Sequence, residues 1–162
     1  MISYKVLLLD IMKFQPIYLS GAFVIKMQLI KDNRGSFSRI FCKDAFKKKK
    51  LNFSYPQLNN SENFKAGTLR GMHMQKKPMD EVKLVRCTKG KIFDVIVDFR
   101  KKSKTFLKWY GTELSETNNK MLYVPSGFLH GYLTLSKNSS VSYLVSKPYS
   151  KELEFGLRYD DP

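Results

Sequence analysis

The chain alternates short apolar runs with clusters of turn residues, a spacing that predicts strands rather than helices. Strand-like segments fall at 22–30, 81–88, 91–98, 106–114, 120–124, 131–135 and 140–145. Turn residues such as Lys89-Gly90 and those at 115–119 separate them. Short strands spaced about 8–12 residues apart, with turns between them, are typical of a β-sandwich or barrel. The pattern therefore predicts a single all-β domain.

Several stretches of the amino-terminal half need separate interpretation. The stretch 35–41 alternates apolar and polar residues, and this period of two predicts a half-buried strand. The polar stretch 43–51 is the best helix candidate, 52–66 is interpreted as a loop-rich connection, and Arg70-Gly71 as a turn. Residues 1–15 are interpreted as an extension or edge strand that precedes a domain over 16–162.

The composition is that of a folded chain with a large positive charge. With 162 residues, of which 43% are hydrophobic and 14% aromatic, the chain can bury a core. A formal net charge of +15 raises the question of nucleic-acid binding. The charge is mostly dispersed lysine, however, and no recognition helix, zinc module or RNA-binding motif is present. This favours a solvated lysine-rich surface, or a basic rim that attracts a nucleotide diphosphate, and no nucleic-acid partner is expected.

Cysteine usage and hydropathy indicate the compartment. Cys42 and Cys87 are isolated in sequence, which fits a reducing environment better than a disulfide framework. The apolar run at 6–9 is too short to cross a membrane or to form a signal peptide. We therefore expect a cytoplasmic protein with no membrane contact.

Two histidines, His73 and His130, are the strongest candidates for chemistry. A zinc or iron site needs three or four ligands. Gln75 stands where a metal-binding barrel would often have another histidine, so only Glu81 could join the two imidazoles. Neither a nucleophile elbow nor a glycine-rich phosphate loop is present. What remains is acid–base chemistry by histidine, and no metal or other cofactor is expected.

Two charged residues interrupt otherwise apolar predicted strands, Lys83 in 81–88 and Asp94 in 91–98. A charge that points into a barrel needs a partner or a function. Taken singly, Lys83 could be a snorkelling edge lysine, His73 a structural histidine and Tyr143 a core aromatic residue. Their combination in one β domain favours a functional site.

Five segments stand in a specific order along the chain. They are DNRGSF (32–37), TLRGMHMQ (68–75), KLVRCTKGKIFDVIVDFR (83–100), GTELSETNNKMLYVPSGFLHGYLTLS (111–136) and YLVSKPYSKELEFGLRYDDP (143–162). Together they resemble the dTDP-4-dehydrorhamnose 3,5-epimerase family, a branch of the cupin superfamily, over about 22–162. This resemblance implies a double-stranded β-helix (the cupin jelly roll) and a homodimer that needs no cofactor.

The resemblance also implies roles for particular residues. His73 matches the general base, Tyr143 the proton donor, Lys83 the lysine near the substrate's ketone, and Asp94 an acidic residue that lines the site. A base can remove the proton next to a 4-keto group, and a cation then stabilises the enolate oxygen. Substrate contacts are implied for Arg34, Arg39, Gln57, Asn59, Arg70, His130, Tyr149 and Glu154. Of these, Tyr149 matches the aromatic residue that stacks on the thymine base.

The expected function is that of an epimerase of a nucleotide-linked 4-keto-6-deoxysugar, of the dTDP-4-dehydro-6-deoxyglucose 3,5-epimerase type, in deoxysugar and polysaccharide biosynthesis. One alternative is a mono-epimerase or ketoisomerase that acts on another nucleotide 4-keto sugar. A second is a non-catalytic cupin that binds a sugar nucleotide.

The chain departs from the family's pattern at four places. Arg39 stands where the family has a glutamate, Leu58 replaces an aspartate, and Met74 replaces an aromatic residue. The chain stops at Pro162, whereas the family continues with a segment whose aspartate pairs with the base histidine. We therefore expect a divergent or C-terminally shortened member in which Asp94 orients His73.

Overall fold

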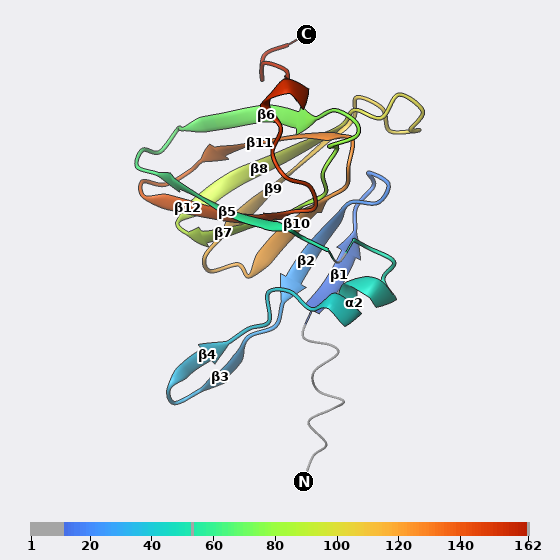
Figure 1. Cartoon of the computed structure of the whole chain (residues 1–162). Coiled ribbons are helices and arrows are strands. Elements are labelled where there is room, and N and C mark those ends of the chain that lie inside the picture. Colours follow the sequence, from blue (N-terminus) through green and yellow to red (C-terminus); the bar gives the residue numbers. More distant parts are fainter. Residues whose placement is uncertain (1–11, 53, 162) are drawn as a thin grey trace.

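The structure is a computed structural model that describes residues 12–52 and 54–161. Two antiparallel sheets pack face to face (Figure 1). In spatial order, the larger sheet contains β1 (Met12–Pro16), β2 (Phe23–Met27), β10 (Lys120–Val124), β7 (Lys83–Lys89), β12 (Ser139–Val145) and β5 (Gln57–Asn63). The smaller sheet contains β13 (Glu154–Gly156), β6 (Leu69–Gln75), β11 (Phe128–Thr134), β8 (Lys91–Asp98) and β9 (Trp109–Ser115). A one-turn 3-10 helix, η1 (Lys151–Leu153), leads into β13.

The core between the sheets follows from the alternation of side chains along each strand. In β8, Ile92 and Ile96 are fully buried, whereas Phe93 points outward and is exposed. The two isoleucines belong to one apolar cluster with Val85 of β7 and Val141 of β12. Burying an aliphatic side chain of this size stabilises a fold by about 1.5–3 kcal/mol. The cluster therefore holds the two sheets together and fixes the strands whose inner faces also carry polar side chains.

Strand β7 is buried on both of its faces. Val85 belongs to the cluster between the sheets, whereas Leu84 joins a second cluster on the other face together with Phe46. Phe46 is fully buried and comes from α2 (Lys43–Lys48). This helix confirms the one predicted over 43–51, although it is shorter. No helix in the described part of the chain is long and apolar enough to cross a membrane.

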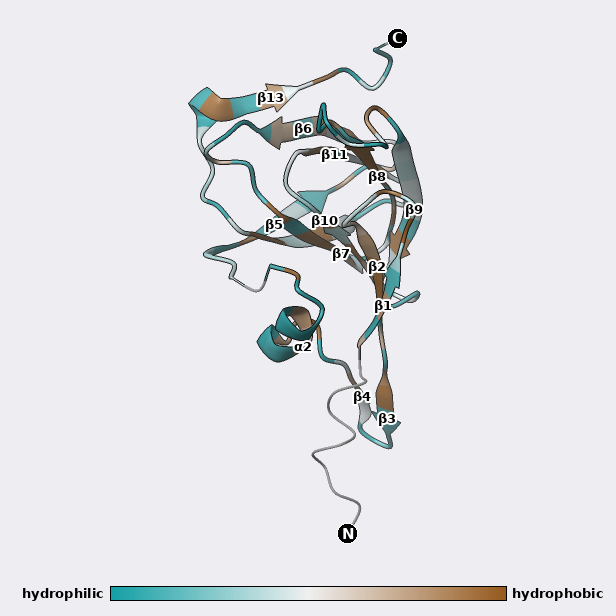
Figure 2. Ribbon diagram, turned by 90° about the vertical axis from the view of Figure 1, so that its right-hand side faces the viewer, coloured by the Kyte–Doolittle hydropathy of each residue, from teal (hydrophilic) through white to brown (hydrophobic). Residues whose placement is uncertain are grey.

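The prediction of a half-buried strand over 35–41 is wrong. Strand β4 (Gly35–Phe37) pairs only with β3 (Ile30–Asp32), and every residue of this hairpin is exposed. The hairpin projects from the barrel on the side opposite β13 (Figures 1 and 2). A period of two indicates a strand but not whether another layer covers its apolar face.

The prediction of a loop over 52–66 and of a turn at Arg70-Gly71 is also wrong. Strand β5 pairs with β12 along its whole length, and its side chains alternate between more and less exposed positions. Arg70 and Gly71 lie inside β6, where Gly71 has φ +115°. A side chain at Gly71 would meet the Gly131 Cα at 2.5 Å. This glycine therefore allows β6 and β11 to approach closely and does not end a strand.

The first described residues form an edge strand. Strand β1 pairs with β2 from Met12 to Pro16 and ends the larger sheet. The part of the predicted extension over 1–11 lies outside the described residues.

Candidate active site

A polar cavity of about 380 Å³ lies between the two sheets. Strands of both sheets line it with polar and ionisable side chains, among them Gln57, Asn59, His73, Lys83, Tyr143 and Glu154. A neighbouring cavity of about 330 Å³ shares His73, Lys83 and Tyr143 with the first and adds Arg70, His130 and Tyr132. His73, Lys83 and Tyr143 therefore stand where the two cavities meet.

Strand register brings the two histidines together. His73 of β6 is the pairing partner of His130 of β11, and the centroids of their rings are 6.2 Å apart. The sequence places the two residues 57 positions apart (130 − 73), so only the antiparallel pairing of these strands makes them neighbours. His130 lies within β11.

His73 is held as a neutral imidazole. Its burial lowers the pKa to about 3, and the nearby charges of Lys83 and His130 act in the same direction. Burial and like charges both disfavour the protonated ring. No side chain among the described residues hydrogen-bonds to this ring. The imidazole is therefore unprotonated at neutral pH, which is the form that can act as a base.

Asp94 does not orient His73, which corrects the expectation from the sequence. Its Oδ1 atom lies 2.8 Å from Nε2 of His130, and both side chains are buried. The reason is strand order, because β11 separates β8, which carries Asp94, from β6, which carries His73. Asp94 and His130 thus form a carboxylate–imidazole pair beside the neighbouring cavity.

Lys83 is a buried lysine with an ion-pair partner. Its Nζ lies 3.1 Å from Oε1 of Glu81, and each side chain is only 6% exposed. Burial lowers the pKa of Lys83, whereas Glu81, Asp94 and Glu154 act to raise it. An ammonium group in this position would stabilise negative charge that develops on a bound ligand.

Tyr143 faces the cavity from the sheet opposite His73. It lies on β12 of the larger sheet, next to β7, whereas His73 lies on the smaller sheet. Burial raises the pKa of the Tyr143 phenol, and Tyr132 contributes in the same direction. The phenol therefore keeps its proton at neutral pH. A proton acceptor and a proton donor face one cavity from opposite sides.

Comparison with known proteins gives one consistent result. Residues 16–162 match the family model described as dTDP-4-dehydrorhamnose 3,5-epimerase. A protein of that name from Sinorhizobium fredii is 43% identical over 95% of this chain and 79% of its own length. The chain belongs to the dTDP-4-dehydrorhamnose 3,5-epimerase family. The family resemblance inferred from the five sequence segments is confirmed.

Solved structures of this epimerase family confirm the fold. The Bacillus anthracis enzyme, solved with TDP and PPi bound, has a TM-score of 0.90 at 38% identity, over 93% of this chain and 86% of its own. The Legionella pneumophila enzyme, solved with dTDP-4-keto-L-rhamnose, has a TM-score of 0.88 at 32% identity, over 93% and 80% respectively. The all-β cupin fold predicted from the sequence is therefore correct.

Within this epimerase fold, most of the predicted substrate contacts line the cavities. Gln57 donates to Asn59 across 3.2 Å within β5, and Tyr149 donates to Glu154 of β13 across 2.8 Å, and all four residues line the first cavity. Arg70 lines the neighbouring cavity and donates to Asn63 at 2.8 Å. Leu58, by contrast, is 67% exposed and is not among the residues that line either cavity.

Two predicted contacts of the epimerase, Arg34 and Arg39, do not reach the cavity of their own chain. Arg34 sits at the tip of the exposed β3–β4 hairpin and pairs with Asp32 at 2.6 Å. Arg39 lies in the segment between this hairpin and α2. Neither residue lines either of the two cavities.

The structure adds site residues that sequence reasoning did not assign to the substrate. Glu81, Gln75 and Lys147 line the first cavity, and Ser61 and Tyr132 line the second. A signal was present for two of them, because Glu81 precedes Lys83 by two positions and Tyr132 follows His130 by two. No three His, Cys, Asp or Glu side chains of the described residues are grouped so that they could hold a metal ion.

Proposed function

We propose that this family member epimerises a dTDP-linked 4-keto-6-deoxysugar, as an isomerase of the 3,5-epimerase type. One observation carries the proposal: a neutral His73 and a protonated Tyr143 face the same cavity from opposite sheets, next to the amine of Lys83. Inversion at a carbon requires that a proton leaves from one face and another arrives at the opposite face.

The proposed reaction moves protons and one electron pair. His73 takes the proton from the carbon next to the ketone and becomes imidazolium, and the C–H electron pair forms the enolate. Lys83 stabilises the negative charge on the enolate oxygen. Tyr143 then delivers its proton to the other face of the carbon, and the ketone re-forms. Proton exchange with solvent restores the neutral imidazole and the phenol, and the same steps at the second carbon give double inversion.

We assign substrate binding to the residues around this centre. Tyr149 is 60% exposed and lies at the cavity with Glu154, which suits stacking on the thymine base. The polar groups of Gln57, Asn59, Arg70 and His130 would contact the sugar and diphosphate. The relatives solved with TDP and with dTDP-4-keto-L-rhamnose support a dTDP-linked substrate.

We also propose a homodimer in which each hairpin serves the partner's site. Arg34 and Arg39 match substrate contacts of the family, but Arg34 lies in the β3–β4 hairpin and Arg39 follows it. This hairpin projects on the side opposite β13. A second copy related by two-fold symmetry would bring each hairpin to the other cavity. We place the reaction in the cytoplasm, because Cys42 and Cys87 are both free thiols, as a reducing compartment would keep them.

Hydrogen exchange in D2O tests the proposed function. The protein is incubated with dTDP-4-keto-6-deoxyglucose, and deuterium at C3 and C5 is followed by NMR. We expect incorporation at both carbons, reduced at least about 100-fold in His73→Ala because the base is lost. Tyr143→Phe should still remove protons but should invert the carbons much more slowly.

The remaining outcomes distinguish the alternatives. Deuterium at one carbon only would identify a mono-epimerase. Tight binding of dTDP without exchange of any 4-keto sugar in a panel would contradict the proposal and identify a non-catalytic binding protein.

A further inference from the structure

Together with His130–Asp94, the Glu81–Lys83 pair is one of two ion pairs of the described residues in which both side chains are buried, and both of its residues line the first cavity. In the Lys91–Glu113 pair, for comparison, the side chains are 49% and 48% exposed and lie 3.9 Å apart. In the Glu81–Lys83 pair both side chains are 6% exposed and line the cavity. The pair therefore sits where a ligand would bind and not at the surface.

Stability alone does not explain this pair. Removing two charges from water carries a desolvation penalty that often exceeds their attraction, so apolar replacements are frequently neutral or stabilising. Glu81 adds a further penalty, because its Oε2 atom is buried with no hydrogen-bond partner among the described residues. A buried carboxylate that is only half satisfied indicates a role in the site.

The surroundings of Lys83 define what that role is. The titratable groups around it are Glu81 on its own segment, His73 on β6, Asp94 on β8, Tyr143 on β12 and Glu154 on β13. Of the other two carboxylates, Asp94 bonds His130 through Oδ1 and, like Glu81, has a second oxygen that is buried without a hydrogen-bond partner, whereas Glu154 accepts from Tyr149. Glu81 is thus the carboxylate that contacts the ammonium group.

We propose that Glu81 is a positioning residue that keeps Lys83 charged and in place where the ketone oxygen of the substrate gains negative charge. The inference rests on the proposed epimerase function. Burial alone lowers the pKa of Lys83, and Glu81 is the strongest of the groups that oppose this shift. Without the negative charge of Glu81, Lys83 would lose its proton at a lower pH. The enolate would then lose the positive charge that stabilises it.

The test compares pH profiles of kcat and KM for three proteins: the wild type, Glu81→Gln and Glu113→Gln. Glu81→Gln keeps the shape and one oxygen acceptor but removes the charge. We expect its alkaline limb to move at least about one pH unit lower, with kcat at pH 8 reduced at least about tenfold and KM changed little. Lowering the pH should restore its activity. Glu113→Gln, the same change in the exposed pair, should behave as wild type.

Two further variants separate charge from structure. Glu81→Asp keeps the charge, so its alkaline limb should coincide with that of the wild type even if its rate is lower. In a Lys83→Arg background, Glu81→Gln should no longer move the profile, because the guanidinium stays protonated at every accessible pH. An alkaline limb in Glu81→Gln that matches the wild type, with activity reduced equally at all pH values, would overturn the proposal.

A measurement without turnover keeps this inference distinct from the proposed function. The ¹³Cε resonance of Lys83, assigned by its loss in Lys83→Arg, is titrated in the wild type and in Glu81→Gln. A lower pKa in the variant together with no exchange of any 4-keto sugar would support the role of Glu81 in holding the charge and contradict the epimerase. An unchanged pKa of Lys83 in Glu81→Gln, together with epimerase activity in the wild type, would contradict the role of Glu81 and support the epimerase function.

Discussion

At the scale of single residues, the protonation state of His73 depends on its surroundings and not on a hydrogen-bond partner. Burial, Lys83 and His130 all disfavour the imidazolium ion. Asp94, which was expected to hold His73, instead fixes His130 at 2.8 Å.

This environment gives a prediction for the pH dependence of stability. The pKa of His73 is about 3 in the folded protein against an ordinary value of 6.5. Between these values the unfolded chain binds the extra proton, so stability rises with pH through this window and is lost as the pH falls from 6.5 toward 3. Urea unfolding at several pH values should show this slope, reduced in His73→Gln.

NMR titration checks the same prediction directly. With only two histidines in the chain, the Cε1–H resonances can be assigned from His73→Gln alone. We expect the His73 resonance to stay at its neutral position down to about pH 4, and Lys83→Met to move its titration upward. A midpoint near 6.5 for His73 in the wild type would contradict the assignment.

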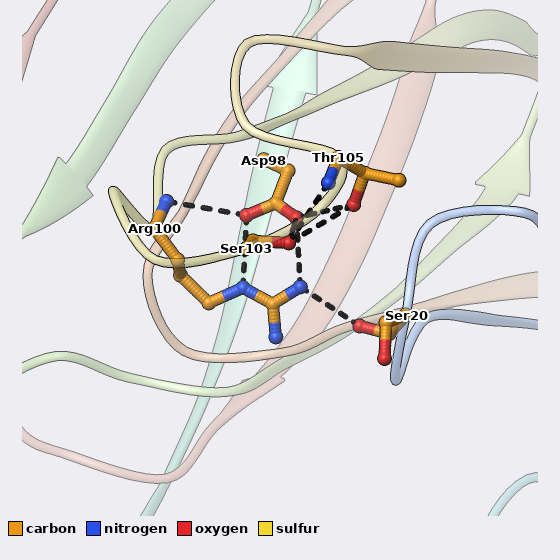
Figure 3. A network of polar contacts seen from close by, with 5 residues as sticks. All are labelled: Ser20, Asp98, Arg100, Ser103 and Thr105. Atoms are coloured by element: carbon orange, nitrogen blue, oxygen red, sulfur yellow. Dashed lines mark hydrogen bonds and ion pairs between the residues drawn. The ribbon is translucent and has the colours of Figure 1, made fainter.

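At the scale of the elements, the loop after β8 depends on one buried carboxylate (Figure 3). Asp98 accepts hydrogen bonds from the Arg100 guanidinium and from the hydroxyls of Ser103 and Thr105, at 2.5–2.8 Å. Arg100 in turn donates to the backbone of Ser20 at 3.0 Å. The network ties the loop to the segment between β1 and β2, and so links the two sheets at this point.

Asp98→Asn should destabilise the fold by about 3 kcal/mol, because it leaves a partly buried guanidinium without its charge partner. Burial would raise the pKa of Asp98, but the hydrogen bonds from Arg100, Ser103 and Thr105 outweigh it and hold the pKa well below its usual range. This stability is present above about pH 4 and is lost as the pH falls below it.

Urea unfolding at pH 7 and at pH 3 measures both effects. The variant should lose most at pH 7, and the difference from wild type should shrink toward pH 3. Asp160→Asn, which breaks the exposed Arg158–Asp160 pair, serves as the matched control and should change stability by less than about 1 kcal/mol. Equal losses for the two variants would show that the loop does not depend on Asp98.

At the scale of the whole molecule, we propose that the site is shared between two copies of the chain. The cavity contains Tyr143, His73 and Lys83, to which the proposal assigns the acid, the base and the cation, whereas Arg34 projects on an exposed hairpin with its side chain 85% exposed. An arginine on the partner's hairpin would meet the anionic end of the substrate, since guanidinium groups bind phosphate oxygens in pairs.

Subunit mixing tests this arrangement. Arg34→Ala should raise KM, and His73→Ala should abolish kcat. After the two variants are mixed and allowed to exchange subunits, about a quarter of all sites should combine an intact cavity with an intact hairpin. At a substrate concentration well below the KM of Arg34→Ala, activity should therefore recover to about a quarter of the wild-type level. A monomer by light scattering, or no recovery in a mixture proven to contain heterodimers, would contradict a shared site.

The sequence by itself determined the class of fold and the family, and it singled out most of the polar residues that line the cavities. Strand β8 was predicted at its observed bounds of 91–98, and β10 at its observed bounds of 120–124. Each is a short, mostly apolar run bounded by turn residues, a pattern that indicates a buried strand. The charges at Lys83 and Asp94 stood out against that apolar background. The local sequence pattern is sufficient to predict a strand when that strand is stabilised by its own buried side chains.

Only the tertiary structure decided which polar residues meet. Strand β5 is rich in asparagine, which has low strand propensity, and it is a strand because β12 pairs with it and its inner side lines a polar cavity. The order of strands assigned Asp94 to His130 instead of His73. The exposure of the hairpin at 30–37 could likewise not be predicted from the sequence, because the period of the pattern does not show whether another layer packs on the apolar face.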